Sequence, residues 1–553
     1  MVTGAKNTSR HARHAKRRTG TEKGGVARSS VLMAGGTVVS RGTGLIRQVL
    51  QGAALGTGLL ATTYNTANTV PTSLYTLLIG GALNAVLVPQ LVRARATHAD
   101  GGRAYEQRLV TLVVSVLAVG TLVAVWAAPE IVSLYIRDTP KEHDAFRLTV
   151  VFARFLLPQI FFYGLFAILG QVLNAREKFG AMMWTPVLNN VVLVTMFGIY
   201  LGMMAIPHSI ADVTDAQVRW LGIGTTAGIA LQALALIPFA RAAGFRFRPR
   251  FDWRGSGLGS GIHAAKWTLL FVLTNLVALT VVTNYANAAD QQLPKAGVGY
   301  TAYSYAQTIW MLPQSIVTVS LVTALLPRMS KAAAEGRIAD LRADLSRALR
   351  VSGVVIVPAA FLFTALGPDI ATLLFAHGTA DAASAQPLGH MLQAFGLGLI
   401  PFSAQYLLLR GFYAFEDTRT PFFMAVWIGV VNIVLTTACH LLLPARWAVT
   451  GMAGAYTLSY LVGLVLTARL LARRTGGRLD DGSLRGTYAR LLCAGAGGAA
   501  AGWALARGCA DAVGDGTAGT ALTTTAGSLA LALVYLLLAR VLKVGEVRRL
   551  RGW

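Results

Sequence analysis

The chain has 553 residues, of which 54% are hydrophobic and only 13% are charged, and its mean hydropathy is +0.55. Because soluble domains carry about 25% charged residues, this composition excludes an ordinary soluble protein. The net charge of +25 would indicate nucleic-acid binding in a soluble protein, but here the basic residues lie in short loops between apolar segments, which membrane topology explains better.

Apolar stretches follow one another along almost the whole chain. They run to roughly 18–25 residues, the length at which a helix crosses about 30 Å of hydrocarbon. They are apolar on all faces and rich in Leu, Ala, Val and Gly, so the period-two alternation of a membrane barrel is absent. We therefore predict an all-α polytopic membrane protein of about fourteen transmembrane helices, near residues 30–54, 64–90, 107–128, 147–172, 179–204, 219–240, 261–284, 298–326, 345–366, 385–410, 419–443, 447–468, 487–507 and 518–542.

Basic residues predict the orientation of these helices. The first thirty residues hold many Lys and Arg against a single Glu22 and have no apolar core before a cleavage site, so we expect 1–29 to be a cytoplasmic tail and not a signal peptide. Counted from this tail, the predicted inner loops are arginine-rich, whereas the outer loops hold little beyond Arg137, Lys141, Lys295 and Arg446. The positive-inside rule thus predicts a multi-pass protein of the inner (cytoplasmic) membrane with both termini in the cytoplasm. The same basic runs could also contact anionic membrane lipids.

The sequence repeats itself at an offset of 243 residues, with identities at the pairs Pro158/Pro401, Tyr163/Tyr406, Arg176/Arg419, Trp184/Trp427 and Asn189/Asn432. Each copy covers six predicted spans, and six is even, so both copies keep one orientation. We expect a parallel pseudo-two-fold repeat with the substrate path between the lobes, as in parallel-repeat transporters. The predicted divisions are a basic tail at 1–29, an N-lobe at 30–240, a basic cytoplasmic linker at 241–260, a C-lobe at 261–470, and two additional helices with a cytoplasmic tail at 471–553.

Ionisable residues inside a membrane span are functional candidates because they are costly there. All twenty-four Asp and Glu can be assigned to loops, tails or span ends, whereas Arg41, Arg47 and Arg154 lie within spans. An ion-coupled antiporter typically needs a membrane carboxylate, and an anion carrier needs fixed cations. Arginine suits phosphate oxygens because it is always charged and donates two parallel hydrogen bonds. We therefore expect Arg41 and Arg47 to line an anion-binding cavity; snorkelling to the outer face is the alternative for Arg47 and Arg154.

The remaining polar residues give weaker signals. The second span carries Asn65, Asn68 and Asn84, with Pro71 and paired glycines as possible hinge elements. The three cysteines form no CxxC or Cys/His cluster, and the histidines have neither zinc spacing nor a nucleophile beside them. We expect no metal site, no cofactor and no catalytic residue.

The first two spans and the eighth carry motifs that resemble a known family. They are the run SRGTGLIR from Ser40 to Arg47, YNTAN from Tyr64 to Asn68, Pro71, GGALN from Gly80 to Asn84, and LLPRMS from Leu325 to Ser330. Together these motifs resemble the MurJ (MviN) family of lipid II flippases, of the MOP exporter superfamily, and the composition is similar to that of actinobacterial members. The plan of two six-helix lobes plus two helices extends the resemblance over nearly the whole chain.

The resemblance implies a flippase that moves the lipid-linked peptidoglycan precursor, lipid II, from the inner to the outer leaflet by alternating access, in cell-wall synthesis. It implies that Arg41 and Arg47 meet the diphosphate of the undecaprenyl-linked substrate. Ser40, Asn65, Asn68 and Asn84 are then further candidates for substrate binding, as are Tyr75 and Thr308, which stand where many members carry arginines. Cell-wall synthesis proteins are possible partners.

The sequence also departs from the family in ways that leave alternatives open. The acidic residue that commonly precedes the aromatic of the second span is replaced near Thr62. Where some members have carboxylates of a sodium site, the chain offers only neutral groups such as Asn275, Asn284 and Asn432. A drug or organic-cation antiporter of the same fold remains an alternative, disfavoured by the lack of a membrane carboxylate. A non-transporting scaffold of the cell-wall machinery is another, motivated by Tyr75 and Thr308.

Overall fold

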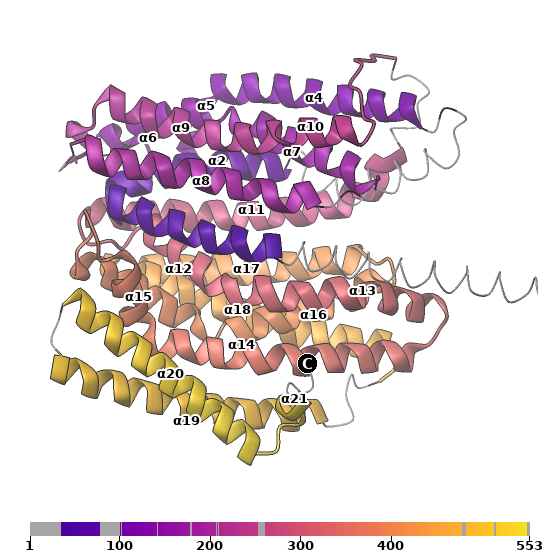
Figure 1. Cartoon of the computed structure of the whole chain (residues 1–553), viewed down its shortest axis with the longest axis vertical. Helices are drawn as coiled ribbons and strands as arrows, with labels where there is room; N and C mark the ends of the chain where they lie inside the picture. The colour runs from indigo at the N-terminus through magenta and orange to yellow at the C-terminus, as the bar shows by residue number, and fades with distance from the viewer. Residues whose placement is uncertain are drawn as a thin grey trace, which may run out of the picture.

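The protein is a bundle of long helices, seen here in a computed structural model (Figure 1). The structure describes residues 35–77, 100, 102–140, 142–176, 178, 180–205, 207, 209–252, 260–477, 483–513 and 516–549, and these residues contain no strand. Nine of the described helices are long and apolar enough to cross a membrane, or up to eleven if each of two bent pairs is one span. Helices over 35–55, Leu59–Tyr75 and Ser483–Val513 lie at three further predicted spans. The arrangement is compatible with the predicted fourteen.

The N-terminal half forms one lobe, shown in indigo to magenta in Figure 1. After the helix at 35–55 its elements are α2 (Leu59–Tyr75), α4 (Arg103–Trp126), α5 (Ala128–Ser133), α6 (His143–Leu156), α7 (Gln159–Asn174), α8 (Gly180–Met203), the 3-10 turn η3 (Ile210–Asp212), α9 (Asp215–Leu234) and α10 (Leu236–Ala242). The predicted basic tail at 1–29 lies outside the described residues, as does Asn84.

The second half forms the other lobe and an appended pair of helices. The lobe contains α11 (Ser260–Gln292), α12 (Tyr300–Pro313), the π turn η4 (Gln314–Thr318), α13 (Val319–Ala334), α14 (Ile338–Phe375), α15 (Ala382–Gly396), α16 (Leu399–Ala414), α17 (Arg419–Leu442) and α18 (Ala445–Arg474). Beyond it α19 (Ser483–Val513) and α20 (Thr517–Val541), yellow in Figure 1, pack on each other and on α14, followed by α21 (Gly545–Arg549).

The two lobes repeat one packing scheme. In the N-lobe α7 contacts α4 and α9, α6 contacts α9, and α8 contacts α9. In the C-lobe the same contacts join α16 to α14 and α18, α15 to α18, and α17 to α18. The break between α6 and α7 at Pro158 corresponds to the 49° bend between α15 and α16, next to Pro401. The fold therefore contains the parallel repeat that the 243-residue offset indicates.

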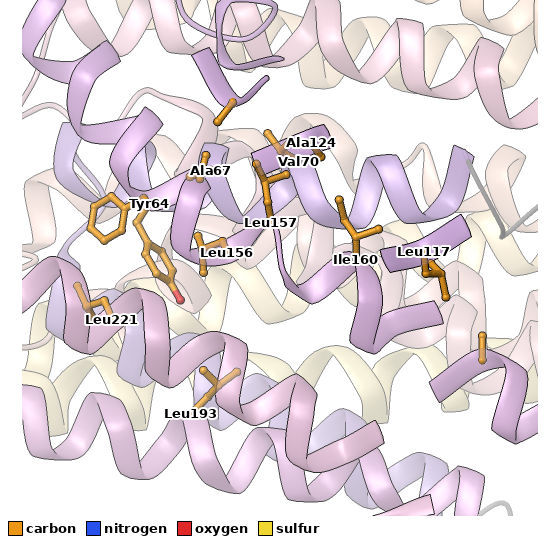
Figure 2. Packing of buried hydrophobic residues seen from close by; sticks show 14 of the residues in the cluster. Tyr64, Ala67, Val70, Leu117, Ala124, Leu156, Leu157, Ile160, Leu193 and Leu221 are labelled. Atoms are coloured by element: carbon orange, nitrogen blue, oxygen red, sulfur yellow. The ribbon is translucent and has the colours of Figure 1, made fainter. Parts of the chain in front are cut away.

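Each lobe has its own buried cluster of apolar side chains. In the N-lobe Tyr64, Leu156 and Leu157 lie at the centre of such a cluster (Figure 2), and the Tyr64 hydroxyl is 2.6 Å from that of Thr225. Large apolar side chains also cover the outside, where Trp126 is 82% exposed. Lipid tails are as apolar as these residues, so close packing and internal hydrogen bonds hold the lobes together in a membrane, rather than burial from water.

One buried ion pair fixes the ends of three N-lobe elements. The guanidinium of Arg176, just after α7, donates to both oxygens of Glu106 in α4, at 2.5 and 2.7 Å, and to the carbonyl of Ala243 after α10. In the other repeat Arg419 pairs with no carboxylate of the described residues and lies over the rings of Trp267 and Phe423 instead. The duplicated arginine has thus kept its position while its partners have changed.

Candidate site between the two lobes

The cationic candidates come from the helix at 35–55. Arg47 is half-buried, and its Nε is buried without a hydrogen-bond partner among the described residues. The hydroxyls of Tyr64, Tyr163 and Tyr305 are close enough to interact electrostatically with its guanidinium. Arg41 is exposed. Across the described ranges no salt bridge involves either arginine, so both charges are free to meet an anion.

Aromatic and amide side chains of α2 and α7 face one another on the same side of the N-lobe. The rings of Tyr75 and Tyr163 are stacked with their centroids 5.6 Å apart. The amide of Gln159 donates to the oxygen of Asn68 over 3.3 Å. Tyr163 therefore links two of the predicted positions, Tyr75 and Arg47, that are far apart in the sequence.

A row of polar contacts joins α2 to the other lobe, and we call it the seam. The amide of Asn65 donates to Thr301 (3.0 Å) and accepts from Gln51 (2.7 Å). The hydroxyls of Thr62 and Thr301 are 3.2 Å apart. Further along, Thr66 donates to Asn287 (3.2 Å), and the hydroxyls of Thr69 and Tyr300 are 3.0 Å apart. Buried polar groups specify one alignment because each needs its partner, so the seam defines how the lobes close.

Backbone hydrogen bonds join the two lobes near the N-terminal end of α2. The carbonyl of Ala53 accepts from the backbone N–H of Thr379 at 3.0 Å, and the N–H of Leu59 donates to the carbonyl of Pro294 at 3.2 Å. Gly297 has φ +65°, and a Cβ there would lie 2.2 Å from the carbonyl oxygen of Ser384 in the same lobe and 2.8 Å from the hydroxyl of Thr57 in the N-lobe. Glycine is thus required at this closure for both conformation and space.

Outside the closure lies a cavity of about 860 Å³ between the lobes. Its lining includes Glu142 and Asp144 from the N-lobe, and Lys295 and Asp381 from the C-lobe. The cavity ends at Leu59 and Pro294, and the seam begins directly next to this end of the cavity. In this structure the lobes are therefore closed on the cavity side of the seam.

A smaller cavity of about 190 Å³ lies within the C-lobe. Asn275 and Asn432 line it together with Gln307 and Tyr460, so its described polar lining is uncharged. Asn284 lies elsewhere, with its amide 3.4 Å from the carbonyl of Leu134. Asn275, Asn284 and Asn432, the neutral groups noted in the seventh and eleventh spans, therefore do not converge on one point.

The structure lengthens the seventh predicted span and so changes where Asp290 lies. We predicted that the seventh span ends near residue 284, but α11 continues to Gln292. Asp290 therefore lies inside the helix and is fully buried. The polar run from Asn287 to Gln292 resembles a loop in the sequence, but it remains helical because Asn287 is paired through Thr66 and the backbone carbonyl of Tyr135.

The structure places the predicted site residues in different surroundings. Arg47, Tyr75, Asn65 and Asn68 take part in contacts between helices, as described above. The carbonyl of Ser40 accepts from Asn190, whereas the exposed Thr308 donates only to its own helix, at Ser304. Gln51, Thr301 and Asp290 were not among the predicted site residues. Their amide, hydroxyl and carboxyl groups were visible in the sequence, but only the packing of the lobes shows that they meet α2.

Comparison with known proteins gives a consistent result. The family model described as "Lipid II flippase MurJ" matches residues 52–507. A probable lipid II flippase MurJ of Rhizobium meliloti is 29% identical over 452 residues, covering 80% of each chain, and the lipid II flippase MurJ of Burkholderia cenocepacia is 27% identical over 450 residues, covering 80% of this chain and 82% of that protein.

Solved structures show the same fold. A lipid II flippase MurJ in an inward closed conformation superposes with a TM-score of 0.71 at 17% identity, covering 93% of this chain and 99% of that one. An inward-facing MATE-family multidrug transporter of the MOP superfamily gives 0.61 at 14% identity, with 78% and 95% covered. At these identities the structural likeness establishes the architecture alone.

Proposed function

Because this chain belongs to the MurJ family of lipid II flippases, we propose that it moves lipid II from the inner to the outer leaflet by alternate opening of its two lobes. The single observation that carries the proposal is the pair of arginines Arg41 and Arg47 on the helix between the lobes, which form no salt bridge with any described residue. Fixed cations without a carboxylate partner suit a diphosphate. No covalent bond changes in this activity, so the protein is a transporter and not an enzyme.

The other candidate residues fit a path between the lobes. Arg41 and Arg47 bind the diphosphate, while Ser40, Asn68, Tyr75 and Thr308 contact the headgroup and the polyprenyl tail stays in lipid. Asn65 becomes available to substrate only when the seam opens, since it is fully engaged in the closed state. Asn84, outside the described residues, is proposed for the same path from its sequence position.

The proposed location is the inner membrane, with both termini and the arginine-rich loops in the cytoplasm. This orientation puts the cavity of Glu142 and Asp381 on the outer face and makes the observed closure an outer gate. The free arginines then face a path that opens to the cytoplasm, where the substrate is made. Cell-wall synthesis proteins are proposed partners on either face.

The test is the export of lipid II after depletion of this protein, with variants supplied in its place. Arg47→Ala and Arg41→Ala should each reduce outer-leaflet lipid II by tenfold or more, on the order of the 1.4 kcal/mol or greater expected for losing a charged hydrogen bond. Arg219→Ala, which removes an exposed arginine of α9, is the matched control and should export normally.

The same experiment separates the alternatives. Normal export in both arginine variants, with the protein in the membrane, would rule out the proposed substrate path. Proton-driven transport of a cationic dye would favour an antiporter. Unchanged export after depletion, with a partner protein mislocalised, would favour a scaffold.

A further inference from the structure

Asp290 is a carboxyl group enclosed at the boundary between the lobes. It lies in the last turn of α11 with 0% of its surface exposed. Its Cγ is so close to α12 that a Cβ on Gly299 would come within 2.4 Å of it. On the opposite side the polar neighbour is Thr62 of α2. The carboxyl group therefore touches both lobes and can be exposed only if they separate.

Neither oxygen of this carboxyl group has a hydrogen-bond partner among the described residues. Of the nearby polar groups, Asn65 pairs with Gln51 and Thr301, and the Thr62 hydroxyl, 3.2 Å from that of Thr301, is the one left to contact the carboxyl group. The titratable or charged side chains on the elements around it include Arg47, Tyr64, Lys295, Tyr300, Tyr303 and Tyr305. Tyr64 and Tyr300 point to Thr225 and Thr69, and Lys295 is exposed in the outer cavity. No cation of the described chain compensates Asp290.

An ionised carboxylate without a partner in such a place costs several kcal/mol, so a group enclosed in this way takes up a proton. A protonated carboxyl can also donate a hydrogen bond, and the Thr62 hydroxyl can accept it. Once the lobes part, water solvates the group and the ionised form becomes the stable one. Closure of the seam and protonation of Asp290 are therefore linked.

The geometry also indicates the side from which the proton comes. Gln291, the next residue, lines the outer cavity, as do Pro294 and Lys295 just beyond it. Towards the other side, Asn65 donates to Thr301 and accepts from Gln51, which lies one helical turn after Arg47. Opening the closure at Leu59 and Pro294 is thus the short path from water to the carboxyl group.

We propose that Asp290 is a proton-operated latch of the outer gate: closure binds one proton at this residue, and opening releases it to the outer side. The latch rests on the proposed alternating access and adds the ion that controls it. Protonation stabilises only the closed gate, so acid favours closure and a rise in pH favours opening. With one proton linked, the closed-to-open ratio changes by up to about tenfold per pH unit.

The test measures the gate directly, without substrate. In the full chain in phosphatidylethanolamine/phosphatidylglycerol nanodiscs, Cys439, Cys493 and Cys509 are replaced by serine, and spin labels are attached at A211C and A382C, exposed positions on opposite lobes beside the outer cavity. Wild type should show the short distance in mildly acidic buffer and a growing long-distance population as the pH rises. Asp290→Asn, which mimics the protonated acid, should keep the short distance at every pH.

Asp144→Asn is the matched control, because it removes an exposed carboxylate of the same cavity, and it should respond to pH as wild type does. If Asp290→Asn does not fold, Asp290→Ala is measured instead. It removes the titrating group and should leave the distance independent of pH.

Three results would overturn the latch. They are a wild-type distance that does not depend on pH, an unchanged pH response in Asp290→Asn or Asp290→Ala, and a response to sodium at constant pH in place of the pH response. None of these results would contradict the proposed lipid II transport, because that proposal is tested by lipid II export in the arginine variants. Conversely, normal export in the arginine variants would contradict the transport proposal but not a pH response of the gate.

Discussion

The side-chain amide of Asn65 in α2 donates a 3.0 Å hydrogen bond to the hydroxyl of Thr301 in α12, which joins the two lobes within the membrane. The same hydroxyl is 3.2 Å from that of Thr62. Thr301 is fully buried, so each partner loses a contact that nothing replaces if this oxygen is removed. The seam is thus a small polar network whose members depend on one another.

Thr301→Val should weaken the closed state of the outer gate. The substitution keeps the shape of the side chain but leaves Asn65 with an unpaired buried donor, at a cost of about 1–3 kcal/mol. The spin-label distance across the outer cavity should therefore shift towards the open population. Thr63→Val is the matched control, because the Thr63 hydroxyl is equally buried but donates within its own helix, to Leu60. Equal shifts in the two variants would show that the seam has no special role in closure.

Gly297→Ala should prevent full closure. The residue has φ +65°, and the added Cβ would lie 2.2 Å from the Ser384 carbonyl of its own lobe and 2.8 Å from the Thr57 hydroxyl of the N-lobe, so the loop must move and the contact between the lobes at Thr57 is pushed open. Gly336→Ala is the control, since it has φ +71° but no atom within 4 Å of the added Cβ. Both variants carry the left-handed strain of about 1–2 kcal/mol. Only Gly297→Ala should increase the labelling of a cysteine at the outer cavity by a water-soluble reagent. A matching increase in Gly336→Ala would attribute the effect to strain alone.

The helices could be predicted from the sequence because each must be apolar along its whole length to cross the membrane. The repeat was visible for a similar reason, since rarer residues such as Trp184 and Trp427 persist at one offset. The arrangement of the seam was not visible. It depends on which face of α2 meets α11 and α12, and helical faces that are apolar almost all round carry little information on this point.

Asp290 shows most clearly what cannot be predicted from the sequence alone. A run of polar residues after a span predicts a loop, and hydropathy alone ends the helix near residue 284. The helix continues because the small residues Ala286 and Ala289 are buried against neighbours and Asn287 has partners on two other elements. Long-range contacts of this kind override local polarity, and only the fold reveals them.

Asp381 predicts a separate pH effect at the outer face. Its carboxylate caps α15 by accepting from the N–H of Ser384 at 2.8 Å, and hydrogen bonds from Ser384 hold the pKa of this carboxyl below its usual 3.8. A lowered pKa stabilises the folded state above the unfolded value, and this contribution is lost as the pH falls through the folded value. Asp381→Ala should therefore cost about 1 kcal/mol near neutral pH and little in strong acid.

Thermal unfolding across a pH series checks the cap. Asp381→Asn should keep most of the neutral-pH stability, because asparagine also caps helices, and should lose the acid-dependent part. If the alanine variant were destabilised equally at every pH, the cap would not depend on the ionised carboxylate. This transition lies in stronger acid than the mildly acidic range used for Asp290, so the two effects can be separated.

Arg176 and Arg419 should respond very differently to the same substitution, although the repeat makes them equivalent. Arg176→Ala leaves Glu106 as a buried charge without its bidentate partner, and breaking such a pair costs about 3–5 kcal/mol. Arg419→Ala removes ring contacts at Trp267 and Phe423, worth about 0.5–1 kcal/mol at an exposed site. Melting temperature in detergent should fall strongly for the first variant and slightly for the second. Arg176→Ala combined with Glu106→Gln should recover part of the lost stability, because no unpaired charge remains. If the double variant were as unstable as Arg176→Ala alone, the contact with Ala243, and not the ion pair, would hold these three elements together.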